Sequence, residues 1–235
     1  MARRTRLKNR RDDAATASVT AAYVKRDLPF FDPLNPDVVA GLETQVDWIL
    51  QEVGIAFRDD PKALEIWRKA GVKPEGDLIK APADWIRALC RKAPSEFTQR
   101  ARNPERSVRI GGAHQVFAPI YGAPFVRDLK QGRRYGDLDS FTKLVKLVQM
   151  LPSLHHYGLV IVEPCDVPVS KRHLDMVYAH MRYTDKPHLG AITEQSRAQD
   201  SVDMAEILHG KEAMDTQCVI LGNVNTNSPL LVDKV

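Results

Sequence analysis

Cysteines, long apolar runs and nucleotide-binding glycine motifs are scarce or missing in this sequence of 235 residues. Its three cysteines, Cys90, Cys165 and Cys218, are an odd number without a CxxC pair, so we expect reduced thiols rather than a disulfide framework. No apolar stretch is long enough for a signal core or a membrane span, and no GxGxxG, HExxH or S-adenosylmethionine motif occurs. We therefore expect a soluble cytoplasmic protein without a membrane partner.

Positive charge gathers at the amino terminus. The net charge is +4, but the chain beyond the first eleven residues is close to neutral. No aromatic residue interleaves the basic run, which favours a solvated arm over a nucleic-acid contact. Asp12 and Asp13 follow at once, which is unlike a transit peptide. We expect residues 1–30 to be a basic, disordered tail, whose first basic side chains are Arg3, Arg4, Arg6, Lys8, Arg10 and Arg11.

Three amphipathic patterns predict helices over residues 35–54, 60–71 and 82–93. Asn35 and Asp60 are expected N-caps, because each precedes a proline at the first helical position. Each helix carries one tryptophan on its apolar face, and we interpret these as packing residues: Trp48, Trp67 and Trp85.

A change of pattern follows these helices. Two extended runs flank the turn sequence Asn103 to Arg106 and predict a β-hairpin. From Asp137 onward, helical patterns alternate with apolar runs, and Ser196 with Gln199 forms an expected capping box. The strands are expected to start near residues 116, 158, 187 and 217, and the helices to cover residues 137–151, 170–183 and 196–210.

The spacing of the expected strands fits successive βαβ units. A complete barrel of eight such units needs about 250 residues. The expected fold class is therefore α/β: a partial (β/α)8 TIM barrel of about four strands over residues 115–235, preceded over residues 31–114 by an α-helical and β-hairpin region. A half barrel exposes strand edges, so we expect an N-terminal fragment that is truncated and inactive by itself, and self-association stays open.

In such barrels the chemistry lies where strands end and in the loops that follow. Two aromatic rings there either plug the barrel mouth or bind a quaternary ammonium ion through their faces. A carboxylate is either a solvated loop group or a charge partner or proton acceptor, and asparagines are either turn residues or polar ligands. The candidate substrate-binding residues are Tyr121, Phe125, Arg127, Glu163, Asn223, Asn225 and Asn227.

Histidines at strand starts lie at the opposite end from this expected site. We interpret His155, His156 and His188 as structural, and we expect no metal. A zinc site made by His155, His156 and Cys165 is the alternative that the residues leave open.

Three ordered blocks, residues 103–141, 151–193 and 219–233, resemble the trimethylamine methyltransferase family, with similarity over about residues 35–235. The resemblance implies a barrel that binds a tertiary or quaternary methylated amine, betaine-like in the members without pyrrolysine. It also implies transfer of one methyl group to the Co(I) corrinoid of a separate partner protein, with no cofactor bound directly. Two alternatives stay open: a non-catalytic remnant or interaction module, and a zinc-dependent barrel enzyme.

Overall fold

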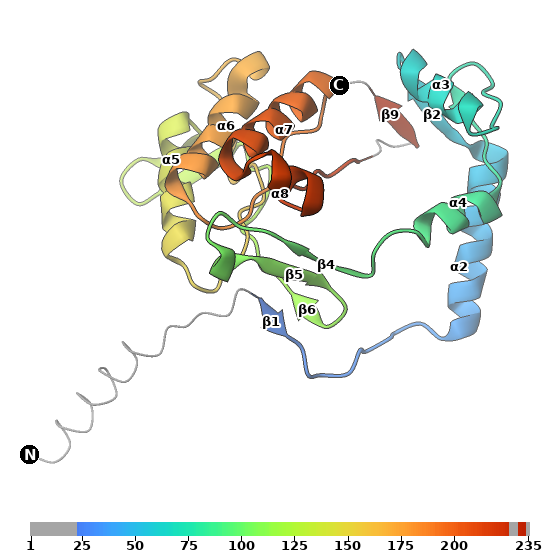
Figure 1. Cartoon of the computed structure of the whole chain (residues 1–235), viewed down its shortest axis with the longest axis horizontal. Helices are drawn as coiled ribbons and strands as arrows, with labels where there is room; N and C mark the ends of the chain where they lie inside the picture. Colours follow the sequence, from blue (N-terminus) through green and yellow to red (C-terminus); the bar gives the residue numbers. More distant parts are fainter. Residues whose placement is uncertain (1–22, 226–229, 234–235) are drawn as a thin grey trace, which may run out of the picture. The chain divides into compact units, whose positions relative to one another are not determined.

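The computed structural model describes residues 23–225 and 230–233, which form a mixed α/β protein (Figure 1). Residues 1–22 of the expected tail therefore lie outside the described residues, whereas Val24–Lys25 form a short strand, so the expected disorder is wrong for that part of the tail. Within the described ranges, no helix is both long and apolar enough to cross a membrane. The chain divides into two compact parts: the first holds residues 23–26, 96–191 and 199–221, and the second holds residues 27–95, 192–198, 222–225 and 230–233. The domain boundaries expected from the sequence stay a prediction.

The second part begins with the expected amino-terminal helices. Asn35 Oδ1 accepts the Val38 amide at 2.9 Å and Asp60 Oδ1 accepts the Ala63 amide at 3.0 Å, so both predicted N-caps are confirmed. A single π-helical turn, Ile49–Val53, ends at Gly54, whose φ of 77° suits glycine. The helices are α2 (Pro36–Trp48), α3 (Pro61–Lys69) and α4 (Ala83–Cys90).

A small mixed sheet accompanies these helices. Strand β2 (Ile55–Arg58) pairs antiparallel with β3 (Leu78–Ile79) and parallel with β9 (Leu231–Asp233). Trp67 and Trp85 pack with their ring centroids 5.5 Å apart around a core of Val72, Ile79 and Ala81. The packing prediction for Trp48 is wrong, because this side chain is 54% exposed and α2 buries none of its residues.

The first part contains the predicted hairpin. Strand β4 (Glu96–Gln99) pairs antiparallel with β5 (Val108–Gly111), and a short 3-10 turn, Pro104–Arg106, occupies the predicted bend. Strands β6 (His114–Gln115) and β1 (Val24–Lys25) extend the sheet beyond β5.

Four further helices cover the rest of the chain: α5 (Leu138–Met150), α6 (Val169–Tyr183), α7 (Gln195–His209) and α8 (Lys211–Thr216). The first three confirm their predictions, whereas α8 had not been predicted. The predicted capping box is wrong, because α7 already begins at Gln195. Gln199 donates instead to Asp203 at 2.7 Å along the same helix.

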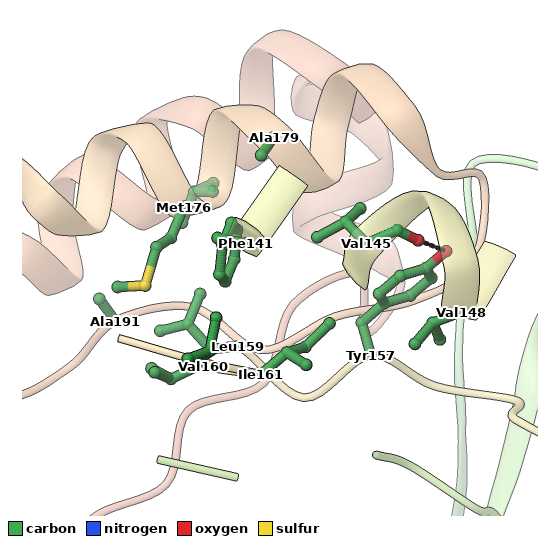
Figure 2. Close-up of a cluster of buried hydrophobic side chains, with 12 residues drawn as sticks. Phe141, Val145, Val148, Tyr157, Leu159, Val160, Ile161, Met176, Ala179 and Ala191 are labelled. Atoms are coloured by element: carbon green, nitrogen blue, oxygen red, sulfur yellow. Dashed lines mark hydrogen bonds between the residues drawn. The ribbon is translucent and has the colours of Figure 1, made fainter. Parts of the chain in front are cut away.

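The main core lies where α5 and α6 cover an apolar segment, residues 157–162 (Figure 2). Phe141 and Val145 of α5 and Val177 of α6 are almost fully buried against it. The buried Tyr157 hydroxyl donates to Val145 O at 2.9 Å, which satisfies its polar atom inside this core.

The segments expected to be barrel strands are joined by a few separate backbone hydrogen bonds. Gly122 N donates to Val160 O at 2.8 Å, Leu189 N to Gly158 O at 2.9 Å, and Gly190 N to Leu221 O at 2.8 Å. Prolines and glycines interrupt these segments, and Gly158 has a φ of 64°, so no continuous ladder forms among them in the described part. The structure thus shows a mixed α/β fold, and the barrel stays a proposal.

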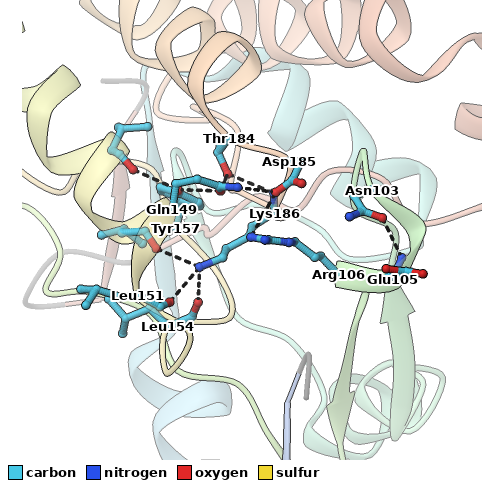
Figure 3. Close-up of polar contacts among 12 residues, drawn as sticks. Asn103, Glu105, Arg106, Gln149, Leu151, Leu154, Tyr157, Thr184, Asp185 and Lys186 are labelled. Atoms are coloured by element: carbon cyan, nitrogen blue, oxygen red, sulfur yellow. Dashed lines mark hydrogen bonds and ion pairs between the residues drawn. The ribbon is translucent and has the colours of Figure 1, made fainter. Parts of the chain in front are cut away.

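The side chain of Lys186 forms hydrogen bonds at the carboxyl end of α5 (Figure 3). Its buried ammonium donates to the carbonyls of Val148, Leu151 and Leu154 at 2.8 to 2.9 Å. These are carbonyls at and just beyond the end of the helix, where intrahelical partners run out. Burial is the main cause that lowers the pKa of Lys186 to about 8.

Candidate functional site

Tyr121 and Glu163 lie on neighbouring extended segments. The Gly122 amide donates to Val160 O, and the Glu163 amide donates to Ala123 O, both at 2.8 Å. Gly158 lies beside the Tyr121 ring with a φ of 64°, a backbone conformation that favours glycine. Burial and then the negative charge of Glu163 raise the pKa of the half-exposed Tyr121 hydroxyl. The structure therefore brings an aromatic ring and a carboxylate to one place.

The carboxylate of Glu163 has a charge partner. Arg172 Nη1 lies 3.2 Å from Glu163 Oε2, and Arg172 Nη2 donates to Val167 O at 3.1 Å. Of the two interpretations given to Glu163, the geometry provides the ion pair. The sequence prediction did not include Arg172, because an arginine in the first turns of an amphipathic helix is usually a solvated side chain.

Gly136 lets another segment approach Glu163 closely. A Cβ at Gly136 would lie 2.5 Å from Glu163 O and 2.5 Å from Val162 Cγ2. The Gly136 carbonyl accepts the Cys165 amide at 2.9 Å, and its amide donates to Pro124 O at 3.0 Å. This close approach and the two backbone hydrogen bonds hold the carboxyl end of the Glu163 segment.

We expect Gly136→Ala to lower the free energy of unfolding by about 1–3 kcal/mol, because the added methyl group collides with backbone. Gly41→Ala is the matched control, since a Cβ there meets nothing within 4 Å and α2 gains a better helix former. It should raise stability by about 0.5–1 kcal/mol. Urea unfolding of both variants measures this, and equal effects of the two changes would contradict the assigned contact.

Phe125 and Arg127 belong to a hairpin that the sequence did not predict. Strand β7 (Phe125–Asp128) pairs antiparallel with β8 (Gly132–Tyr135), which places Arg127 opposite Arg133. The Arg133 guanidinium carbon lies 3.8 Å from the centroid of the Phe125 ring, and the Tyr135 ring lies 4.7 Å from it. One face of Phe125 thus already holds a cation, and Arg127 is exposed.

Two of the asparagine candidates belong to the other compact part. Asn223 and Asn225 are exposed and belong to the second compact part, whereas Tyr121 and Glu163 belong to the first. Asn227 lies outside the described residues. Within the first compact part, the structure brings Tyr121 and Glu163 together and adds Arg172 to them.

The histidines at the amino ends of the segments make hydrogen bonds. His155 Nδ1 accepts the Phe117 amide at 3.1 Å, and His156 Nδ1 accepts the Gly158 amide at 2.8 Å. The Nε2 of His156 therefore carries the proton, which it donates to Gln99 Oε1 at 3.0 Å. Within the described ranges, no group of three or more histidine, cysteine or carboxylate side chains has an arrangement that could hold a metal ion. The expectation of a protein without metal stays a prediction.

A buried polar cluster surrounds Gln99, which the sequence prediction did not include. Gln99 Nε2 donates to His188 O at 2.9 Å, and His180 Nε2 donates to Leu159 O at 2.9 Å. The rings of His180 and His188 stack with their centroids 5.3 Å apart. Burial lowers the pKa of His156 and of His180 to about 4, and it lowers that of His188 well below the ordinary value. These imidazoles are therefore neutral in the folded protein.

The fold and the site define a mixed α/β protein with an aromatic ring and an ion pair close to the ends of neighbouring segments. Residues 2–235 match the family model described as Trimethylamine methyltransferase (MTTB). The chain belongs to the trimethylamine methyltransferase family, which confirms the resemblance found in the sequence.

Two relatives are named for betaines. The chain is 37% identical over 208 residues to a glycine betaine methyltransferase of Desulfitobacterium hafniense (strain Y51), which covers 88% of this chain and 43% of that protein. It is 27% identical over 193 residues to a proline betaine:corrinoid methyltransferase of Eubacterium limosum, with 77% and 39% covered. The chain thus spans less than half the length of these relatives.

Proposed function

We propose that this chain carries part of the site of a methyltransferase that moves a methyl group from a betaine-like quaternary amine, or from a tertiary amine, to a corrinoid. The corrinoid is the methyl acceptor and belongs to a separate partner protein in the cytoplasm. Membership of the family and the names of the two relatives support this assignment. The observation that carries it is the placement of Tyr121 beside Glu163 on adjacent segments.

The proposed methyl transfer requires little proton transfer by the side chains of the protein. A Co(I) corrinoid would supply the nucleophile, and displacement at a methyl carbon of a quaternary amine would leave the C–N electron pair on a neutral tertiary amine. No general acid is therefore obligatory, and the side chains have to bind and orient the substrate and exclude water. The Tyr121 ring offers a π face to methylated ammonium, and Glu163 offers a negative charge.

The remaining candidates complete this proposal. Phe125 and Arg127 would form the rim of the site, and Asn223, Asn225 and Asn227 would supply polar contacts. The four extended segments would form half of a (β/α)8 barrel whose strand ends face the substrate. The hydrogen bonds between neighbouring segments support this arrangement.

Binding of glycine betaine to the 235-residue chain tests the proposal. We expect Tyr121→Leu to weaken binding by about tenfold, since a cation on an aromatic face gains about 0.5–2 kcal/mol. Tyr178→Leu is the matched control, because Tyr178 on α6 is 53% exposed and Tyr121 is 54% exposed. Isothermal titration calorimetry measures both constants, and equal affinities for the two variants would contradict a role for Tyr121.

Methyl transfer is tested separately by the spectral change of a cob(I)alamin-bearing partner. We expect the 235-residue chain by itself to give no appreciable methylation, which retains the expectation from the sequence. Appreciable transfer would contradict that expectation. A chain that binds no methylated amine would favour the alternative, a non-catalytic interaction module.

A further inference from the structure

We infer that Arg172, held beside Glu163, makes this site select zwitterionic amines, which carry a carboxylate next to the quaternary nitrogen, over amines that are only cationic. The inference rests on the proposed function, because it assigns a substrate class to the same site. It adds a specificity residue that neither the sequence pattern nor the family match identifies.

The guanidinium of Arg172 has unused donors. Of its five N–H groups, one points to Glu163 Oε2 and one to Val167 O. Its Nε is buried and has no hydrogen-bond partner among the described residues. The side chain is nevertheless 20% exposed and that of Glu163 is 31% exposed, so a ligand has access to the edge of the pair. A carboxylate is the ligand whose geometry suits the remaining donors of an arginine.

Hydrogen bonds hold Arg172 both at its backbone and at the tip of its side chain. Arg172 lies in the first turns of α6, where its amide donates to Pro168 O at 3.0 Å. The bond from Nη2 to Val167 O holds the other end against the loop before the helix. Because the backbone of Glu163 is itself tied to Ala123, the two charges face each other from well-defined positions.

The charge balance of the pair decides which ligand it favours. A ligand with only a positive charge is attracted by Glu163 and repelled by Arg172, and the two effects largely cancel because the charges lie 3.2 Å apart. A ligand with both charges separated by one carbon atom can place its ammonium near Glu163 and its carboxylate near Arg172. All four charges then alternate in sign, and the methyl groups remain free to contact Tyr121.

Three ligands separate these contributions in calorimetric titrations of the 235-residue chain. Glycine betaine carries both charges, tetramethylammonium carries only the cation, and 3,3-dimethylbutanoate replaces the nitrogen of glycine betaine by carbon. We expect the wild-type chain to bind glycine betaine at least about tenfold more tightly than either of the other two.

We expect Arg172→Gln to weaken glycine betaine binding by about tenfold or more and to leave tetramethylammonium binding unchanged or tighter. Arg172→Lys keeps the charge without the forked donors and should lose part of the preference. Lys171→Gln, the exposed neighbour on α6, is the matched control and should bind all three ligands like wild type. Circular dichroism establishes that each variant is folded.

The outcomes separate this inference from the proposed function. If Arg172→Gln weakened the binding of all three ligands equally, Arg172 would have only a structural role, and the inference would be overturned. So would unchanged binding of glycine betaine by this variant, with the proposed function still standing. Failure of the wild-type chain to bind any methylated amine would overturn both.

Discussion

The folded protein is expected to lose about 5 kcal/mol of its free energy of unfolding between pH 6.5 and pH 4, because buried imidazoles must take up protons. Histidine ordinarily titrates near 6.5, whereas His156 and His180 in the folded protein titrate near 4. The full difference corresponds to about 3 kcal/mol for each residue, and somewhat less of it is lost by pH 4 because the folded imidazoles are then only about half protonated.

The sign follows from the direction of these shifts. Below pH 6.5 the imidazoles of the unfolded chain bind protons, whereas those of the folded chain stay neutral, so the free energy of unfolding falls as the pH falls. Above pH 6.5 both states are neutral at these sites, and this contribution is fully present. His188, whose pKa is also lowered by burial, adds to the same loss.

Urea unfolding at several pH values from 7 to 4.5 measures this dependence. His180→Gln should make the loss of stability with acid shallower, because one of the two best-defined titrations is gone. A stability that is flat between pH 6.5 and pH 4.5 would refute the neutral buried cluster.

The second large effect is expected at Gln99. Gln99→Ala should lower the free energy of unfolding by about 3–5 kcal/mol, because it leaves a cavity and removes the partners of His156 and of the His188 carbonyl. The side chain is fully buried, so water cannot replace these hydrogen bonds at the surface.

Two further variants divide this effect into its parts. Gln99→Met keeps most of the volume and loses the hydrogen bonds, so its cost should be smaller, about 2–3 kcal/mol. Thr98→Ala changes the next, exposed residue of β4 and should cost less than about 0.5 kcal/mol. Chemical unfolding compares the three, and a loss from Gln99→Ala no larger than that from Thr98→Ala would contradict the assigned network.

Local signals in the sequence were sufficient for the helices other than α8 and for one hairpin. Asn35 and Asp60 could be recognised as caps because the capping hydrogen bond joins residues three apart in the chain. The β4–β5 hairpin could be recognised because its turn lies between two extended runs. Family membership was also visible, since it depends on ordered blocks of sequence and not on three-dimensional contacts.

Long-range polar contacts could not be predicted in this way. Gln99 forms hydrogen bonds with His156 and His188, which are separated from it in the chain by 57 and 89 positions. Lys186 forms hydrogen bonds with carbonyls that lie 32 to 38 positions before it. Nothing in the residues around them marks these partners. Arg172 was missed for a related reason. Only the position of the Glu163 carboxylate in the folded protein distinguishes Arg172 from a solvated arginine on a helix surface.

The contact between Gly136 and Glu163 has a mechanical consequence for the proposed site. Most contacts in a protein pass through side chains, which can change rotamer and absorb small displacements. Here backbone meets backbone, directly after β8, and hydrogen bonds to Pro124 and Cys165 secure both sides. The close approach leaves little room for the base of the β7–β8 hairpin to shift without the segment that carries Glu163, so we expect a displacement of the hairpin to displace Glu163 as well.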